Sequence, residues 1–167
     1  MTLYEEIYKL KTLLRRGWVL RQVPDRTESD AEHTFSMLIL ALEIMSKNNL
    51  NLDQLKVLKM IAYHELCEID AGDVTPVDGV SKEEKYKNEW AGVKRLAKNY
   101  NMPEIETLWL EFEENITPEA QFVKHIDKFD AILQAEIYSK NTNRPELYNE
   151  FKTNGQKIFD DMQKYKR

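Results

Sequence analysis

Apolar residues recur mostly at spacings of three and four along this chain, which is the periodicity of amphipathic helices. Glycine and proline, the residues that most often interrupt helices, are few, with five of each in 167 residues. We find no internal repeat, low-complexity segment or domain linker. The pattern predicts an all-α protein in which residues 1–167 form a single compact domain, a bundle of about six or seven helices.

Capping residues mark where the first helices begin. A first helix is predicted over about residues 3–16, ending at Gly17, and an irregular link over residues 18–28 follows it. Ser29 and Glu32 match a capping box, in which each side chain accepts a hydrogen bond from the other residue's backbone N–H. The helix that they open carries apolar residues at Phe35, Leu38, Ile39, Leu42 and Ile44.

The later helices have similar signals. Asp53 is expected to cap a third helix that ends at Gly72, and Ser81 is expected to open a fourth. The predicted buried stripe of the third helix is Leu55, Leu58, Ile61 and Ala62. Three further helices are expected to begin at prolines, namely Pro103, Pro118 and Pro145. The helix that follows Pro118 should turn Phe122, Ile126, Phe129 and Leu133 inward.

Composition narrows the class of partner. Twenty-four basic and 29 acidic residues give a net charge of −5, which disfavours binding to nucleic acid or to an anionic membrane. No window approaches eighteen consecutive apolar residues, and the first residues lack the features of a signal peptide. The single cysteine, Cys67, excludes an internal disulfide and a multi-cysteine zinc site. We therefore expect a cytoplasmic protein with a small-molecule ligand.

The segment Tyr63–Asp73 carries the clearest chemical signal. It places one histidine and four carboxylates at the end of an apolar helix. Such groups are costly to desolvate unless they are paired, and a divalent cation accepts imidazole and carboxylate together. The segment predicts metal-dependent chemistry, with further ligands from elsewhere in the chain.

Two other residues, His33 and Asp127, could complete such a site. His33 lies one turn into a capped helix, Asp127 lies on a partly apolar helix face, and His125 is expected to point outward. Each has an ordinary interpretation, because a lone histidine is often a core residue and Asp127 could pair with Lys124 or Lys128. Their combination with His64 on three separate helices favours a metal site.

The order of these residues resembles the HD-domain phosphohydrolase superfamily, in which a histidine, a His-Asp pair and a later aspartate follow one another. The resemblance covers most of the chain and points to the branch of 5′-deoxynucleotidases. It rests on Gly17-Trp18-Val19-Leu20-Arg21, Glu28–His33, Gly72-Asp73 and Ile126–Asp130. It implies an HD-domain fold, a homodimer, and one divalent ion (manganese, cobalt, iron, nickel or zinc) held by His33, His64, Glu65 and Asp127.

Glu65 departs from this pattern, because the family has aspartate there. The additional methylene moves the carboxylate outward by roughly 1.5 Å, whereas metal–oxygen distances tolerate about 0.2 Å. The helix could stand further back, Glu65 could coordinate differently, or metal affinity could fall. We favour accommodation by the helix, since every other ligand position is filled.

The implied activity is removal of the 5′-phosphate from (deoxy)nucleoside monophosphates by a metal-activated water. By resemblance, Glu68 and Asp73 would orient and deprotonate that water, although Asp73 could instead cap the turn at Gly72. The expected substrate contacts are Arg16, Trp18, Arg21, Thr75 and Pro76. Guanidinium groups bind phosphate in a forked geometry, and an indole can cover a base or sugar. Trp18 could equally be a core residue and the arginines solvated.

Two other functions stay open from the sequence. The same scaffold could hydrolyse another nucleotide, such as a nucleotide pyrophosphate or a guanosine alarmone. A non-catalytic helical module that binds nucleotide is the third interpretation, and the altered Glu65 is its main support.

Overall fold

The computed structural model describes residues 1–23 and 26–165, and these ranges contain ten α-helices, one 3₁₀ helix and no β-strand. The all-α prediction is confirmed. The α-helices are α1 (Leu3–Thr12), α2 (Arg16–Leu20), α3 (Asp30–Lys47), α4 (Gln54–His64), α5 (Glu68–Ala71), α6 (Lys82–Tyr100), α7 (Glu104–Glu114), α8 (Pro118–Thr142), α9 (Pro145–Asn154) and α10 (Gln156–Gln163). The 3₁₀ helix η1 spans Pro76–Asp78.

The first predicted helix is divided in two. Helix α1 ends at Thr12 because the next residues leave helical geometry and form an isolated antiparallel bridge between Leu14 and Ser29. The Arg15 N–H donates to the Glu28 carbonyl at 2.9 Å across this bridge. Gly17 then lies inside α2 instead of ending a helix, so the predicted link is partly helical. Residues 24 and 25 of that link lie outside the described residues.

The third predicted helix is also divided. Asp53 caps α4 as expected, accepting from the Lys56 N–H at 3.0 Å, but α4 ends at His64. Glu65 occupies the C-cap position, and the chain turns before Glu68 begins α5. Gly72 ends α5 with φ of 73°, in the left-handed region that suits glycine. Because of this break, Glu65 lies just after the end of α4, whereas Glu68 lies at the start of α5.

Other helix starts agree with the sequence. The capping box of Ser29 and Glu32 is present, and Ser81 caps α6. Thr117 caps α8, with Pro118 in the first turn, and Pro103 occupies the N-cap position of α7. The last predicted helix is divided into α9 and α10 at Gly155, where a Cβ would lie only 2.7 Å from Ile132 Cδ1.

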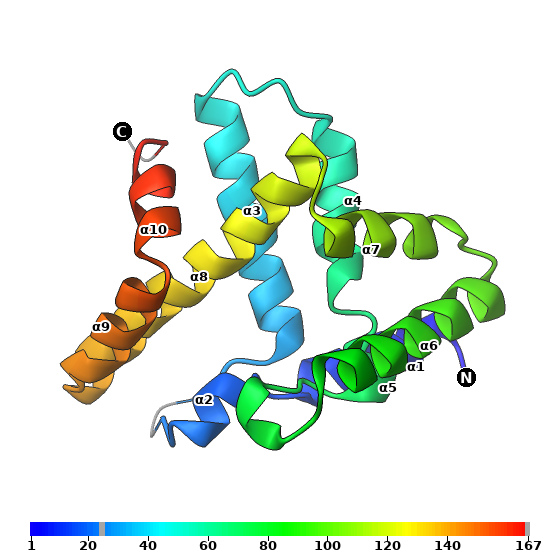
Figure 1. Ribbon diagram of the computed structural model, residues 1–167, viewed down its shortest axis with the longest axis horizontal. Coiled ribbons are helices and arrows are strands. Elements are labelled where there is room, and N and C mark those ends of the chain that lie inside the picture. Colours follow the sequence, from blue (N-terminus) through cyan, green and yellow to red (C-terminus); the bar gives the residue numbers. More distant parts are fainter. Residues whose placement is uncertain (24–25, 166–167) are drawn as a thin grey trace.

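The helices form two groups around separate hydrophobic cores, and α4 and α7 connect the two groups. Helix α8 crosses α3 and α9 folds back along α8, while α6 packs on α5 and α5 on α1 (Figure 1). The first group encloses a core around Met37, Met60 and Phe129, and the second encloses a core around Leu96 and Trp109. A smaller cluster forms around Trp18 beneath α8 and α9. The carboxyl end of α4 lies between the two main cores, where α3, α5 and α8 also meet.

Helix α4 buries a different face from the predicted stripe, and of the apolar residues noted on α3 only Ile44 is deeply buried. On α3 the deeply buried residues are Met37, Leu40, Ala41, Ile44 and Met45. On α4 they are Val57, Met60, Ile61 and His64, so only Ile61 of the predicted stripe is deeply buried, and Leu55 is 63% exposed. Phe122, Ile126 and Phe129 of α8 are buried as expected. No helix in the described residues is long and apolar enough to cross a membrane.

Candidate metal and substrate site

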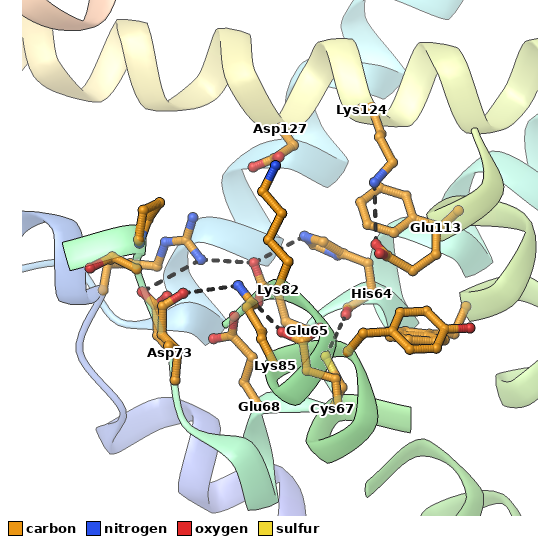
Figure 2. Close-up of a pocket in the computed structure, with 18 of the residues that line it drawn as sticks. His64, Glu65, Cys67, Glu68, Asp73, Lys82, Lys85, Glu113, Lys124 and Asp127 are labelled. Atoms are coloured by element: carbon orange, nitrogen blue, oxygen red, sulfur yellow. Dashed lines mark hydrogen bonds and ion pairs between the residues drawn. The ribbon is translucent and has the colours of Figure 1, made fainter. Parts of the chain in front are cut away.

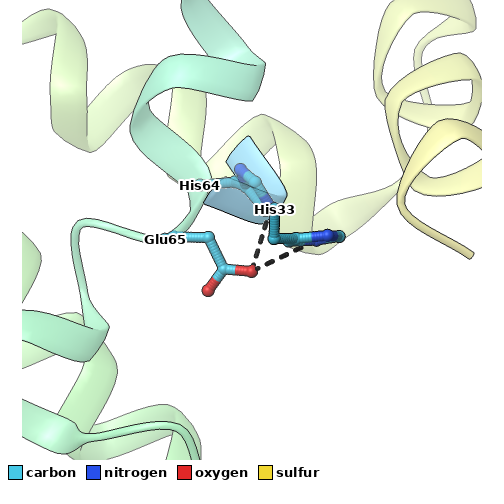
Figure 3. A group of neighbouring side chains, drawn as sticks. All are labelled: His33, His64 and Glu65. Carbon is cyan, nitrogen blue, oxygen red and sulfur yellow. Dashed lines mark ion pairs between the residues drawn. The ribbon is translucent and has the colours of Figure 1, made fainter. Parts of the chain in front are cut away.

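Two buried histidines converge between α3 and α4. His33 comes from the first turns of α3 and His64 is the last residue of α4, and their ring centroids lie 5.9 Å apart. One carboxylate oxygen of Glu65 faces both rings, 3.1 Å from His64 Nε2 and 3.7 Å from His33 Nε2 (Figure 3). Neither Nε2 atom makes a hydrogen bond within the described residues. Two buried, unpartnered imidazole nitrogens beside a carboxylate are a suitable start for a metal site.

The Nδ1 atom of each histidine makes a hydrogen bond that fixes the orientation of the ring. His64 Nδ1 lies 2.6 Å from the Ile61 carbonyl, so this nitrogen donates and Nε2 keeps its lone pair. His33 Nδ1 lies 2.8 Å from Asp130 Oδ2. Partners of this kind orient metal-binding histidines in proteins. The sequence prediction missed Asp130, although it lies three residues after Asp127 and therefore on the same helix face.

Asp127 joins this cluster from the middle of α8. Its Oδ1 atom lies 3.2 Å from His33 Nε2, on the same side as Glu65. Ligand atoms of His33, His64 and Glu65 lie within 4.8 Å of one another, and Asp127 adjoins this group through His33, while His125 is not part of it. The donor set of two imidazoles and two carboxylates fits a divalent transition metal better than calcium.

Charges around His33 strongly favour its protonated form. Burial and the Arg15 guanidinium both lower the pKa of His33, but Asp127 and Asp130 outweigh them and raise it to about 10. Burial raises the pKa of Glu65, but the charges of Arg15 and His64 lower it by more than burial raises it. The pKa of Glu65 is therefore below its usual value. A metal ion bound at His33 must therefore replace a proton, which makes its affinity depend on pH.

A second acidic cluster adjoins the first. Asp30, Glu68 and Asp73 each offer one oxygen within 4.8 Å of the other two, so they also could hold a cation. Burial, and next Glu65, raise the pKa of Asp30 to about 7. Burial is also the main cause that raises the pKa of Glu68 well above its usual value, followed by Glu65 and Asp73. Asp30 is fully buried. The sequence analysis had considered residues 29–32 only as the start of a helix, so it did not identify Asp30 as part of the site.

Arg15 is the arginine that reaches these carboxylates. Its Nη1 atom lies 2.8 Å from Glu65 Oε1, 3.8 Å from Asp30 Oδ1 and 3.9 Å from Asp73 Oδ2. Burial alone would lower the pKa of Arg15, but the surrounding carboxylates raise it above the usual value. Arg15 thus places a permanent positive charge at the centre of the site.

The predicted clamp of Arg16, Trp18 and Arg21 is not directed into this site. The Arg16 guanidinium binds Asp78 Oδ1 at 2.9 and 2.8 Å, and Arg21 pairs with Glu150. None of the three residues lines the main cavity. In this structure the two arginines are held by carboxylates, and Trp18 lines a smaller cavity of about 110 Å³ with His33 and Asp73, so a substrate contact by these residues stays a prediction.

Trp18 and the backbone of Arg16 have structural roles next to the site. Trp18 is 3% exposed, and its indole N–H donates to Glu28 at 3.1 Å, so it is a core residue. The backbone N–H of Arg16 donates to Asp73 Oδ2 at 2.7 Å. This bond fixes the position of Asp73 at the start of the loop that leads to η1.

A cavity of about 560 Å³ opens over His64, Glu65 and Asp127. Figure 2 shows Asp73 at one end and Glu113 at the other, with His64 and Glu65 between them. Thr75 and Pro76, the expected sugar contacts, are among the residues that line the cavity. Three aromatic residues, Tyr86, Trp109 and Phe112, also line the cavity, and the ring centroids of Tyr86 and Trp109 lie 5.4 Å apart.

Four lysines also line this cavity, and the sequence prediction did not include them. They are Lys82, Lys85, Lys124 and Lys128. Their positions in the sequence could have identified them, because Lys82 and Lys85 lie in the first turn of α6 and Lys124 and Lys128 flank Asp127 on α8. Three of them pair with carboxylates of the same lining, Lys85 with Glu89, Lys124 with Glu113 and Lys128 with Asp127, so cationic and acidic groups alternate around the cavity.

Comparisons with known proteins agree with this geometry. The family model described as HD domain matches residues 7–166. The 5′-deoxynucleotidase HDDC2 of Dictyostelium discoideum is 37% identical over 83% of this chain and 76% of its own length. The 5′-deoxynucleotidase hdd1 of Schizosaccharomyces pombe is 34% identical over 90% of this chain and 77% of its own length.

Solved structures share the fold. A conserved hypothetical protein from Pyrococcus furiosus superposes with a TM-score of 0.79 at 28% identity, over 98% of this chain and 92% of its own. A predicted metal-dependent phosphohydrolase from Magnetospirillum magnetotacticum gives a TM-score of 0.70 at 23% identity, over 97% of this chain and 90% of its own. At that identity the second likeness concerns the fold alone.

Proposed function

The chain belongs to the HD-domain family, and from this premise we propose that it is a metal-dependent phosphoric monoester hydrolase. Its substrates are 5′-monophosphates of deoxynucleosides, from which it removes the phosphate. The observation that carries this proposal is the similarity to curated 5′-deoxynucleotidases at 34% and 37% identity over most of the chain. The buried, unpartnered Nε2 atoms of His33 and His64 supply the matching chemistry.

In this proposal His33, His64, Glu65 and Asp127 hold one divalent ion. When bound, such an ion lowers the pKa of water and neutralises charge on a phosphoryl group. Manganese, cobalt, iron, nickel and zinc all suit the donor set.

Arg15 is the proposed phosphate-binding residue, in place of Arg16. Its guanidinium lies among the carboxylates of the site, 2.8 Å from Glu65. A phosphate oxygen can accept from the forked N–H groups of this side chain with a geometry that lysine cannot match. The lysines of the cavity are further proposed N–H donors to phosphate oxygens, beside the carboxylates that line the same cavity.

Glu68 is the proposed general base and Asp73 its positioning partner. The raised pKa of Glu68 makes its carboxylate a better proton acceptor than an ordinary glutamate. The water oxygen forms a bond to phosphorus as the bond from phosphorus to the 5′ oxygen breaks. The proton taken by Glu68 is then available to the departing 5′ oxygen.

The nucleoside would occupy the remaining cavity. Thr75 and Pro76 are the proposed sugar contacts. Of the aromatic residues that line the cavity, Tyr86 is 42% exposed and offers a flat surface for a base. We also propose that the protein acts as a homodimer in the cytoplasm.

Phosphate release tests the proposed function. Purified protein is stripped with a chelator, reconstituted with manganese, cobalt or zinc, and assayed on a panel of ribo- and deoxyribonucleoside monophosphates. We expect metal-dependent release of inorganic phosphate, with deoxynucleotides preferred. Chromatography of the products separates loss of phosphate from loss of pyrophosphate, which would instead indicate a nucleotide pyrophosphate or alarmone substrate. Binding without release in every metal would indicate a non-catalytic module.

A further inference from the structure

Glu68 lies on helix α5, which has only four residues and few bonds of its own to hold it. Cys67 at the N-cap position makes no side-chain hydrogen bond, and the N–H groups of Asp70 and Ala71 reach its carbonyl only at 3.4 and 3.3 Å. A helix this short is not stable by itself in water. The Glu68 Oε2 atom is buried and has no hydrogen-bond partner among the described residues. The position of this carboxylate therefore depends on what holds the backbone of α5.

Asp70 connects the outer face of α5 to α6. It follows Glu68 by two residues, which is about 200° round a helix, so the two carboxylates point to nearly opposite sides. Arg95 on α6 binds both oxygens of Asp70, with Nε 2.5 Å from Oδ2 and Nη2 3.0 Å from Oδ1. The remaining guanidinium nitrogen, Nη1, lies 2.6 Å from Glu6 Oε1 on α1. One guanidinium therefore ties α5 to two longer helices.

The pair of Asp70 and Arg95 differs from an ordinary surface ion pair. The two side chains are 34% and 33% exposed, whereas the Glu6 side chain is 3% exposed. Isolated exposed ion pairs contribute little to stability, but bidentate pairs and networks of charges are the exceptions. Glu6 also accepts from Lys9 at 3.0 Å and from the Tyr100 hydroxyl at 3.4 Å. The buried carboxylate thus anchors Arg95, which in turn holds Asp70.

Gly92 lets α6 pack directly on the start of α5. A Cβ at this position would lie 3.1 Å from the Cys67 carbonyl oxygen and 3.5 Å from Asp70 Cβ. Helix α5 lies beside both α6 and α1 (Figure 1). A side chain at Gly92 would therefore push α5 away from α6 by a few tenths of an ångström.

We propose that Asp70, Arg95 and Gly92 position Glu68 for catalysis. The inference rests on the proposed function, in which Glu68 takes the proton of the attacking water. The three residues act through the backbone of α5 and contact neither substrate nor metal. A displacement of about 1 Å at a reacting group can cost roughly 10²-fold in rate, so a smaller shift of α5 should still lower kcat. KM should change little, because Arg15 and the cavity lining are unaltered.

The main test compares the same substitution at two aspartates of similar exposure. Asp161 on α10 is 37% exposed and pairs with Lys164 at 2.7 Å, far along the chain from α5. Asp70→Asn should lower kcat for deoxynucleoside monophosphates by at least about fivefold, with KM and manganese affinity changed by less than about twofold. Asp161→Asn should keep the kcat of the wild type. Asp70→Glu retains the charge and should recover most of the loss.

Gly92→Ala moves α5 without removing a charge. Alanine favours a helix more than glycine does, so this variant keeps α6 helical. A lower kcat in it therefore reports the position of α5 and not a loss of structure. Helical circular dichroism of each variant verifies that the chain is folded.

Hydrogen exchange of the α5 amides supplies a measurement that does not depend on turnover. Exchange in residues 68–72 should be faster in Asp70→Asn than in the wild type, and unaltered in Asp161→Asn. Unaltered exchange and kcat in Asp70→Asn, an equal fall of kcat in both asparagine variants, or loss of manganese together with activity would overturn the inference. If the wild type released no phosphate while α5 exchange still responded to Asp70→Asn, the hydrolase proposal alone would fail.

Discussion

The Arg15 guanidinium lies 2.8 Å from the Glu65 carboxylate, although the two residues are 50 positions apart in the sequence. The backbone bridge between Leu14 and Ser29 makes this contact possible, because it turns Arg15 away from solvent and into the site. Glu65 in turn faces His33 and His64. One carboxylate thus connects the proposed phosphate-binding residue with the proposed metal ligands.

Arg15→Ala should lower kcat/KM for deoxynucleoside monophosphates by about 10²–10³, the usual loss when a charge-stabilising donor is removed from a site. Arg15→Lys should recover only part of this, because an ammonium cannot bind phosphate in a forked geometry. Arg21→Ala is the matched control, since Arg21 pairs with Glu150 outside the cavity. Steady-state kinetics on all three variants measures the effect. Equal losses in Arg15→Ala and Arg21→Ala would contradict the assignment.

Glu65→Asp should weaken metal binding about tenfold or more. Helix α4 ends at His64, so Glu65 starts from a turn, and its longer side chain is what brings Oε1 within 3.1 Å of His64 Nε2. Aspartate would withdraw the oxygen by roughly 1.5 Å, one carbon–carbon bond. Calorimetric titration with manganese or cobalt measures the change. Glu113→Asp shortens another carboxylate of the cavity and should leave metal affinity unaltered, whereas tighter binding by Glu65→Asp would show that the glutamate is poorly placed.

Local signals in the sequence were sufficient for the helix starts. Capping at Ser29, Asp53 and Thr117 depends on neighbouring residues, so it could be predicted from the sequence. The expectation that His33, His64 and Asp127 lie together came from the family resemblance, because their order on separate helices does not by itself bring them into contact. The position of Arg15 could not be predicted, because it depends on a backbone bridge between distant segments.

Periodicity also could not decide which apolar face each helix buries. Helix α3 has one apolar set around Met37 and Leu40 and another around Phe35 and Ile39, and both have helical spacing. The sequence pattern did not choose between the two sets, and the chain buries the first. A pattern shows that a face avoids water, and it does not distinguish the core of the chain from a contact with a second molecule.

Stability at acidic pH should depend on Glu6. The hydrogen bond from Arg95, at 2.6 Å, is the main cause that lowers the pKa of Glu6 to about 2 from 4.5. Because the folded value is the lower one, the ion pair stabilises the fold above pH 4.5, and this contribution is lost as pH falls from 4.5 towards 2. The loss amounts to roughly 3 kcal/mol at most, from about 1.4 kcal/mol per pH unit.

Glu6→Gln should therefore be less stable than the wild type at pH 7, and the difference should shrink at pH 3. Urea unfolding at both values measures the free energy of unfolding. Glu83→Gln, at an exposed position in the first turn of α6, controls for the general loss of one negative charge. A destabilisation by Glu6→Gln that is equal at both pH values would exclude the ion pair as its cause.

Glu68→Gln should reduce kcat by at least about 10³ while the protein still binds its metal. Glutamine keeps the size of the side chain but cannot accept the proton of the attacking water, and general base catalysis contributes roughly 10²–10⁴. Glu89→Gln is a close control, because Glu89 lines the same cavity, is equally buried, and also has a pKa raised mainly by burial. It stands outside the cluster of Asp30, Glu68 and Asp73, so kcat should change less than fivefold. Metal content measured on both variants separates a lost base from a lost ion. If Glu68→Gln lost its metal together with its activity, Glu68 would act as a ligand, and the base would have to be found among Asp30 and Asp73.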